Sequence, residues 1–219
     1  MDSKQSNKLT AALKEIEHQF GVGTLAKLAR VVPAKSFINT EKYKSIENER
    51  LSTLKKLFDK TGRYKPNAIF SAVNEENDLK LIEAILIEEA DANLMNEQGQ
   101  TPLVKAILLK SQSIINLLIN YKANVNLPCH GVSPLMLAAQ EGLTYIAVSL
   151  IKAGADINDH SGDGMTALML AAREGHADII ELLLSVNVNI KATTVKGATA
   201  LSIAQQFEHE EVVQLIENG

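Results

Sequence analysis

Apolar residues recur at helical spacing over most of the chain. Between residues 67 and 219 they form clusters such as Ile114-Ile115 with Leu117-Leu118-Ile119, and Ile179-Ile180 with Leu182-Leu183-Leu184. Apolar positions three and four residues apart lie on one face of a helix. Aromatic residues make up only 4% of the chain and Trp is absent, which disfavours a β-sandwich or barrel. The pattern therefore predicts an all-α protein.

The first 66 residues predict further helices. An apolar stripe with helical spacing predicts a helix that ends at Gly21-Val22-Gly23, and Thr24 can begin a short second helix. Pro33 breaks the pattern and leaves residues 36–40 extended. A further amphipathic helix is expected over residues 41–58, where it would cover the open end of the helices that follow. The stripe consists of Leu9, Ala12, Leu13, Ile16 and Phe20.

Two phrases repeat in phase through the rest of the chain. Gly99-Gln-Thr-Pro-Leu103 recurs in forms that begin at Gly131, Gly164 and Gly197, so the steps between the glycines are 32, 33 and 33 residues. A repeat of 20–50 residues is the signature of a solenoid. The second phrase occurs as Ala90-Asp-Ala-Asn93, Ala123-Asn-Val-Asn126, Ala155-Asp-Ile-Asn158 and the degenerate Val188-Asn-Ile-Lys191.

These phrases resemble the ankyrin-repeat family, whose unit is a turn and two helices in about 33 residues. The resemblance covers residues 67–219 and implies a helical solenoid of about five units, the first and last atypical. Thr or Ser caps each first helix, and Pro or Ala occupies its first turn. The pairs Ala138-Ala139 and Ala171-Ala172 are small enough to let helices of neighbouring units pack closely. Gly142, Gly154 and Gly175 are expected to end helices.

The repeats depart from the family pattern in two places. The His that follows the Thr-Pro-Leu phrase is absent, so its hydrogen bonds across the turn must be lost or replaced, and a loss would loosen the hairpins. The last unit carries polar residues, as a terminal unit whose outer face meets water requires. The residues that replace the His are Val104, Met136, Met169 and Ser202, and the polar residues of the last unit are Gln205, Gln206, Glu208, Glu210 and Glu211.

Charge divides the chain into two parts. Residues 1–66 hold 14 Lys and Arg against 7 Asp and Glu, a net charge of +7, and residues 67–219 hold 8 against 19, a net charge of −11. Opposite charges on two parts of one chain indicate two roles or an attraction between the parts. The alternative is a solvated surface with no functional meaning.

The N-terminal segment supplies a second resemblance. Ala11-Ala12-Leu13, Ile16-Glu17, Gln19-Phe20-Gly21-Val22-Gly23 and Leu28 lie in one register, and Ile38-Asn39-Thr40 follows. This pattern, over about residues 8–40, resembles the N-terminal polymerisation segment of the bacterial recombinase RecA. In that family the helix and strand reach from one subunit onto the ATPase core of the next. No Gly-x4-Gly-Lys-Ser/Thr phosphate loop follows in this chain, so the resemblance does not extend to the ATPase.

The resemblance implies three regions: a docking segment (residues 1–40), a capping helix and linker (41–66) and the ankyrin repeats (67–219). The docking segment would fill the groove of a RecA subunit with apolar side chains and add an edge strand. The alternative is that the same stripe packs onto the chain's own helices. The docking residues are predicted to be Leu9, Leu13, Ile16, Phe20, Leu25, Leu28, Phe37 and Ile38.

Catalytic, metal and cofactor sites are not predicted. Gly21-Val-Gly-Thr-Leu-Ala26 matches a dinucleotide-binding phrase but follows a helix rather than a strand. Cys129-His130 has no second Cys/His pair to complete a metal site. The acidic segment 156–164 lacks the Gly and Glu of a calcium loop at positions six and twelve, and a hairpin tip explains it better. We therefore expect no enzyme activity, no metal and no cofactor.

The sequence thus predicts a protein-binding adaptor that modulates RecA-dependent recombination, DNA repair or the SOS response. The alternatives are a secreted bacterial effector that binds a host protein and a regulator that uses the basic segment on nucleic acid, which the scarcity of aromatic residues disfavours. Without an apolar run of 18 residues or a leader, we expect a cytoplasmic bacterial protein. The ankyrin family implies contact residues at hairpin tips and first helices: Leu137, Gln140, Asp159, His160, Arg173 and Glu174.

Overall fold

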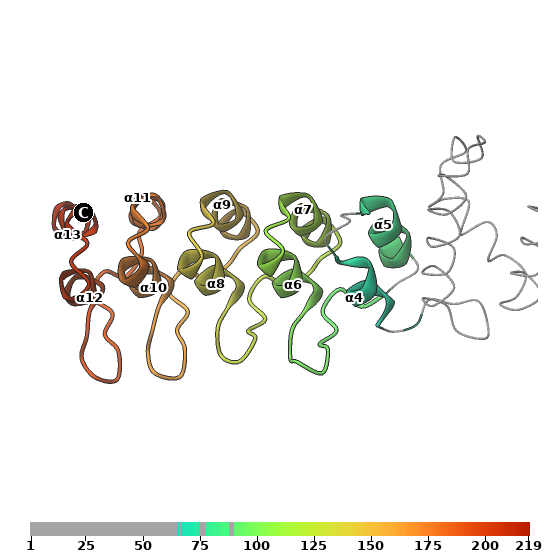
Figure 1. Ribbon diagram of the computed structural model, residues 1–219, viewed down its shortest axis with the longest axis horizontal. Helices are drawn as coiled ribbons and strands as arrows, with labels where there is room; N and C mark the ends of the chain where they lie inside the picture. The colour runs from blue at the N-terminus through green and yellow to red at the C-terminus, as the bar shows by residue number, and fades with distance from the viewer. Residues whose placement is uncertain (1–64, 66, 75–77, 88–89) are drawn as a thin grey trace, which may run out of the picture. The chain divides into compact units, whose positions relative to one another are not determined.

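The computed structural model describes residues 65, 67–74, 78–87 and 90–219 (Figure 1). The chain divides into two compact units, residues 1–91 and 92–219. The predicted docking segment and the helix expected over residues 41–58 lie outside the described residues, so both stay predictions.

The described part of the first unit is one helix pair. Helix α4 (Ala68–Ala72) packs against α5 (Leu79–Ile87). Asn67 occupies the position before α4, where the first repeat was expected to begin. Before α5, the side-chain oxygen of Asp78 accepts a hydrogen bond from the backbone N–H of Leu81 at 3.2 Å. Apolar side chains of both helices form the core of the pair: Ile69, Phe70, Leu81, Ile82 and Ile85.

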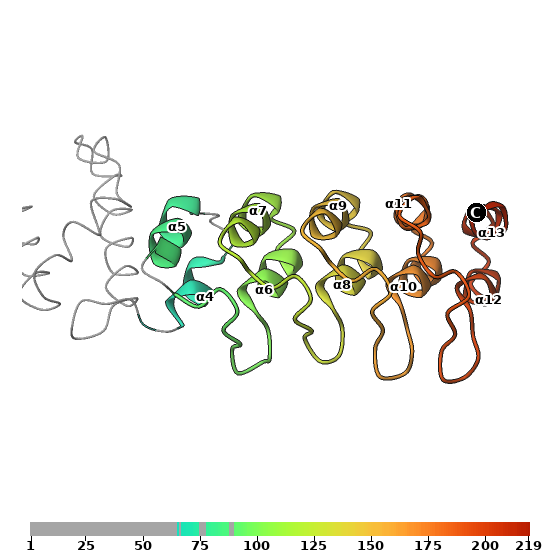
Figure 2. The same ribbon diagram turned by 180° about the vertical axis from the view of Figure 1, so that it is seen from behind.

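The second unit contains four helix pairs, each preceded by a hairpin. The first helices are α6 (Pro102–Leu108), α8 (Pro134–Gln140), α10 (Ala167–Glu174) and α12 (Ala200–Gln206), and they lie in one layer. The second helices form the other layer, and the hairpins project from the side of the first helices (Figures 1 and 2). The second helices are α7 (Gln112–Asn120), α9 (Thr144–Lys152), α11 (Ala177–Ser185) and α13 (Glu210–Asn218).

The repeated phrase begins each first helix, as predicted. A Thr or Ser side chain at the N-cap accepts a hydrogen bond from the backbone N–H three residues later, which satisfies one of the free donors at a helix start. Pro occupies the first turn of α6 and α8. The four caps are Thr101, Ser133, Thr166 and Thr199, and their donors are Val104, Met136, Met169 and Ser202.

The Asn that ends the second phrase connects neighbouring repeats. Asn93 Oδ1 accepts a hydrogen bond from the backbone N–H of Asn124 in the next repeat, at 2.6 Å. Asn126 Oδ1 likewise accepts a hydrogen bond from the backbone N–H of Asp156, at 2.8 Å. Asn158 Oδ1 accepts one from the backbone N–H of Asn189, also at 2.8 Å. In the degenerate fourth phrase Lys191 stands at the same position, and a lysine side chain has no acceptor atom. The phrase is therefore an inter-repeat connection as well as a turn.

Three of the four hairpins share one turn geometry. In residues 96–100, 161–165 and 194–198 the first residue's N–H bonds to the fifth residue's carbonyl, and the fourth residue is a Gly with positive φ. The hairpin over residues 129–132 is instead a two-residue turn in which His130 and Gly131 have φ of 52° and 78°. Turns with two positive φ angles suit hairpins because their twist matches that of the flanking strands. The shorter turn explains the 32-residue step in the sequence.

A side-chain hydrogen bond closes each of the three longer hairpins. Asn96 Oδ1 accepts from the N–H of Gln100 at 2.9 Å. Ser161 Oγ accepts a hydrogen bond from the backbone N–H of Met165, and Thr194 Oγ1 accepts one from the backbone N–H of Ala198, both at 3.0 Å. These hairpins are therefore closed by a side chain as well as by the backbone. In the short hairpin, Cys129 and Val132 exchange two backbone hydrogen bonds of 2.9 and 3.0 Å.

The last helix pair has the predicted polar outer face. Ser202, Gln205 and Glu217 are exposed where the preceding repeat has the apolar Met169, Ala172 and Leu184 at the equivalent positions. In earlier repeats these positions face the next helix pair, so the polar replacements suit a surface in contact with water. The five polar residues predicted there are exposed: Gln205, Gln206, Glu208, Glu210 and Glu211.

Candidate partner-binding surface

The six predicted contact residues fall into two groups on the second unit. Leu137 and Gln140 lie on α8, and Arg173 and Glu174 end α10; Glu174 is exposed and the other three are half-buried. Asp159 and His160 lie at the base of the hairpin that leads into the other end of α10. The eight residues of α10 rise about 12 Å along the helix axis. The structure therefore places the six residues in two groups, one on helices α8 and α10 and the other at the base of the hairpin before α10.

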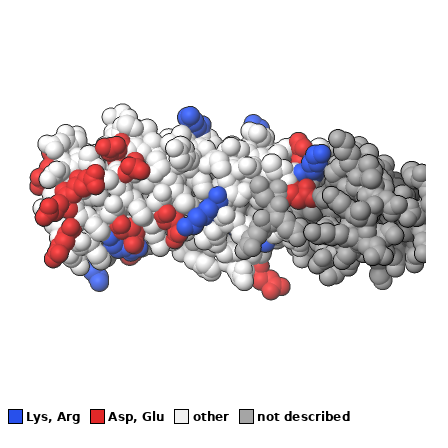
Figure 3. All heavy atoms as spheres, turned by 45° about the horizontal axis from the view of Figure 1, so that its top comes forward, with Lys and Arg blue, Asp and Glu red and all other residues white. Residues whose placement is uncertain are grey.

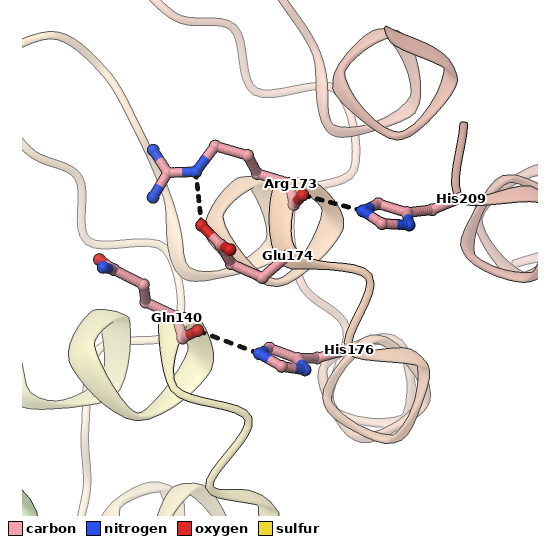
Figure 4. A network of polar contacts seen from close by, with 5 residues as sticks. All are labelled: Gln140, Arg173, Glu174, His176 and His209. Atoms are coloured by element: carbon pink, nitrogen blue, oxygen red, sulfur yellow. Dashed lines mark hydrogen bonds and ion pairs between the residues drawn. The ribbon is translucent and has the colours of Figure 1, made fainter. Parts of the chain in front are cut away.

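At the helix ends, Gln140 and Arg173 are fixed through their backbones. The Nε2 of His176 lies 3.0 Å from the carbonyl oxygen of Gln140, and the Nε2 of His209 lies 2.9 Å from that of Arg173 (Figure 4). Because a carbonyl can only accept, each Nε2 carries the hydrogen. Each bond joins a repeat to the one before it, and the side chains of Gln140 and Arg173 stay on the surface.

Arg173 and Glu174 also form an ion pair. The Nε of Arg173 lies 2.8 Å from the Oε1 of Glu174, and the two side chains are 34% and 40% exposed. An ion pair this exposed contributes little to stability. Its two partners therefore remain available to charged groups of a binding protein.

At the hairpin base, Asp159 and His160 contact each other. Asp159 Oδ1 accepts from the backbone N–H of His160 at 2.8 Å, and His160 Nδ1 lies 3.1 Å from the carbonyl oxygen of Ser161. His160 is exposed and Asp159 is half-buried. Within the same hairpin, the hydroxyl of Ser161 donates to the carboxylate of Asp163. That bond is the main cause that lowers the pKa of Asp163, and backbone N–H groups and Lys196 act in the same direction.

Acidic side chains gather over the last two helix pairs (Figure 3). Helices α11 and α13 carry carboxylates in their first turns, where they also stabilise the positive end of a helix. Part of this charge therefore has a structural explanation. The exposed carboxylates on these helix pairs are Glu174, Asp178, Glu181, Glu208, Glu210, Glu211 and Glu217.

Catalytic geometry is not evident in the described part of the chain. Among those residues, no group of three or more His, Cys, Asp or Glu side chains could hold a metal ion. Cys129 is a free, half-buried thiol. The described helices are also too short and too polar to cross a bilayer.

Two exposed side chains were not among the predicted contact residues. Tyr145, at the start of α9, is 85% exposed, and Val195, in the last hairpin, is 80% exposed. Tyr145 stands at a position where the other second helices carry Ser113, Asp178 and Glu211. That contrast between aligned repeats was the available signal. The bonds of His176 and His209 to the preceding repeat were not predicted, because their partners lie 36 residues away in the sequence.

A row of hairpins and paired antiparallel helices with one shared core is a helical-repeat solenoid. Residues 69–161 and 144–219 match the ankyrin-repeat family, and the chain belongs to that family. Ankyrin repeats are generally protein-binding modules and are usually non-catalytic.

Individual relatives match only part of the chain. YahD, an ankyrin repeat protein of Escherichia coli (strain K12), is 38% identical over 88 residues, which cover 37% of this chain and 44% of that protein. Neurogenic locus notch homolog protein 1 is 36% identical over 77 residues in Xenopus tropicalis and 34% over 76 residues in Homo sapiens. Each Notch match covers 34% of this chain and 3% of the relative. The chain thus spans less than half the length of these relatives.

Proposed function

We propose that this chain is a non-catalytic adaptor that holds partner proteins on its ankyrin repeats. The main support is the arrangement of Gln140, Arg173 and Glu174. The backbones of Gln140 and Arg173 are fixed by bonds between repeats, Glu174 pairs with Arg173, and all three side chains remain at the surface. A partner that binds such a prearranged surface loses less conformational entropy than one that binds a mobile loop.

The residue types at this edge suit a protein interface. Arg173 and the exposed Tyr145 belong to the residue types that contribute most often to binding energy. The hairpin group around His160 supplies hydrogen-bonding atoms at the opposite end of the first helices. Together the two groups support an interface along the first-helix side of α8 and α10.

We further propose RecA as one partner, bound through residues 8–40. The support is the sequence resemblance of that segment alone, since the family match covers residues 69–219. The adaptor would then connect a second protein, held on the repeats, to a RecA filament during recombination or the response to DNA damage. A docked segment would bury Leu13 and Phe20 in the groove of the recombinase.

Titration of purified RecA against the immobilised full chain tests this proposal. The double variant Leu13→Asp/Phe20→Asp should lose binding, because two charges would enter an apolar groove. The variant Tyr145→Asp, which alters the repeats instead, should bind as the unmodified chain does. Equal binding by all three proteins, or no saturable binding by the unmodified chain, would show that residues 8–40 are not a RecA-docking segment.

A further inference from the structure

The junctions between the last four repeats are not equivalent. Between α8 and α10, and between α10 and α12, a His of the later repeat lies over a Gly of the earlier one: His176 over Gly142, and His209 over Gly175. At the junction between α6 and α8 the corresponding residues are Leu143 and Lys110. Leu143 cannot donate the bond that His176 and His209 donate.

The first helices are also spaced differently there. Ile107 of α6 stands where α8 has Ala139 and α10 has Ala172. This position faces the next repeat, since the equivalent Gln205 of the last repeat is exposed. Helix α8 packs along more of α10 than of α6, as expected if the larger Ile107 prevents as close an approach as alanine allows.

Two side-chain contacts cross the junction near the edge that lacks the His bond. Lys110 Nζ lies 3.4 Å from Glu141 Oε2, with 58% and 39% of the two side chains exposed, and an exposed pair contributes little. Gln112 Nε2 lies 2.9 Å from Ser149 Oγ on α9. Its Oε1 is buried without a hydrogen-bond partner among the described residues, which costs free energy.

The opposite edge of the same junction is intact. Asn126 Oδ1 accepts from the N–H of Asp156 at 2.8 Å, and Asn126 Nδ2 donates to the carbonyl of Gly154 at 3.1 Å. These residues lie after the second helices, at the base of the hairpins. The missing His bond lies at the other end, where the first helix turns into the second. The hairpin edge is therefore held by two hydrogen bonds, whereas the edge near Lys110 has one side-chain hydrogen bond and an exposed ion pair in place of the His contact.

We propose that the junction between α6–α7 and α8–α9 is a hinge of the second unit. It opens at the edge of Lys110 and Leu143 and turns about the bonds of Asn126. Helices α8 to α13 move as one block, because both junctions inside that block carry the Gly–His contact. The inference goes beyond the proposed function, since a hinge would act with any partner. A protein bound across α6 and α8 would fix the angle between the two blocks.

Spin-label distances across two junctions test the hinge. Ser113, Tyr145 and Asp178 are exposed and occupy the second position of α7, α9 and α11. With Cys129→Ser as background, nitroxide labels at 113 and 145 span the hinge, and labels at 145 and 178 span the matched junction with a Gly–His contact. We expect a broader distance distribution for 113–145 than for 145–178. Equal widths would overturn the proposal.

Installing the missing contact provides the second readout. Lys110→Gly/Leu143→His should remove the excess width of the 113–145 distribution and leave 145–178 unchanged. Lys110→Gly alone should not narrow it, because the ring is still absent. The reciprocal variant Gly142→Lys/His176→Leu should broaden 145–178. The hinge is contradicted if the double variant leaves 113–145 as broad as before, or if Lys110→Gly alone narrows it equally.

Discussion

The imidazole of His176 lies directly against the backbone of Gly142 in the preceding repeat. A Cβ at Gly142, where φ is +66°, would lie 2.7 Å from the Cε1 of His176. His209 and Gly175 repeat the same relationship, with a distance of 2.7 Å to Nδ1. Glycine is thus favoured at this position for two reasons: the backbone φ is positive, and the imidazole ring leaves no room for a Cβ.

Gly142→Ala should lower the free energy of unfolding by about 2–3 kcal/mol. Alanine in the left-handed region costs about 1–2 kcal/mol, and displacement of the ring weakens a hydrogen bond worth about 1 kcal/mol. Urea denaturation followed by circular dichroism measures the loss. Gly154→Ala is the control, because Gly154 has a φ of +91° but nothing within 4 Å of an added Cβ. A loss no larger than that of the control would contradict the role of the ring.

Asn126→Ala should destabilise the second unit by about 1–2 kcal/mol. The substitution removes the two hydrogen bonds to the next repeat, and each bond is worth about 0.5–1.5 kcal/mol before exposure reduces it. Asn120→Ala, at an exposed position near the end of α7, should change stability by less than about 0.5 kcal/mol. Thermal unfolding of both variants checks the difference, and similar losses would mean that the connection is not made in solution.

His130→Asn should stabilise the chain by about 0.5 kcal/mol. His130 has a φ of 52° in the two-residue turn, and Asn followed by Gly is the most favourable sequence for such a turn. The loss of the ring near Gly99, where an added Cβ would be 3.8 Å away, removes little packing. A higher midpoint in thermal unfolding is expected, and a lower one would show that the imidazole makes a larger contribution than this contact.

Asp163 predicts a pH dependence through its bond with Ser161. The pKa of Asp163 is lowered in the folded chain, first by the hydroxyl of Ser161. A carboxylate with a lowered pKa stabilises the fold above its unfolded pKa, and that stabilisation is lost as the pH falls through its folded pKa. NMR titration should therefore show a higher pKa for Asp163 in Ser161→Ala. The difference in the free energy of unfolding between the unmodified chain and Asp163→Asn should disappear in acid. If Ser161→Ala leaves the pKa of Asp163 unchanged, the hydroxyl of Ser161 is not the cause of the lowered pKa.

Local features of the fold could be predicted from the sequence, and contacts between repeats could not. The caps at Thr101 and Ser133 follow from residues three positions apart, so the phrase alone indicates them. The bond between His176 and Gln140 joins residues 36 positions apart, and no local pattern specifies it. The 32-residue step between Gly99 and Gly131 can be read from the sequence. Its cause, the shorter turn, depends on the backbone angles of His130 and Gly131.

Only some positions of the candidate surface could be predicted from the sequence. The family pattern places Arg173 and Glu174 at the end of a first helix, and the structure has them there. It also assigns Asp159 and His160 to a hairpin tip, whereas the structure has them at the base of that hairpin. The exposure of Tyr145 depends on how α9 sits on its neighbours, which the pattern of one repeat does not contain.

We propose that this chain holds other proteins and that RecA is one of them. Hydrogen–deuterium exchange of the full chain with saturating purified RecA tests it most directly. We predict slower exchange over residues 8–40, with the hairpin 161–165 and helices α8 and α10 unchanged and still open to a second partner. Exchange over residues 8–40 that is identical with and without RecA would contradict the claim.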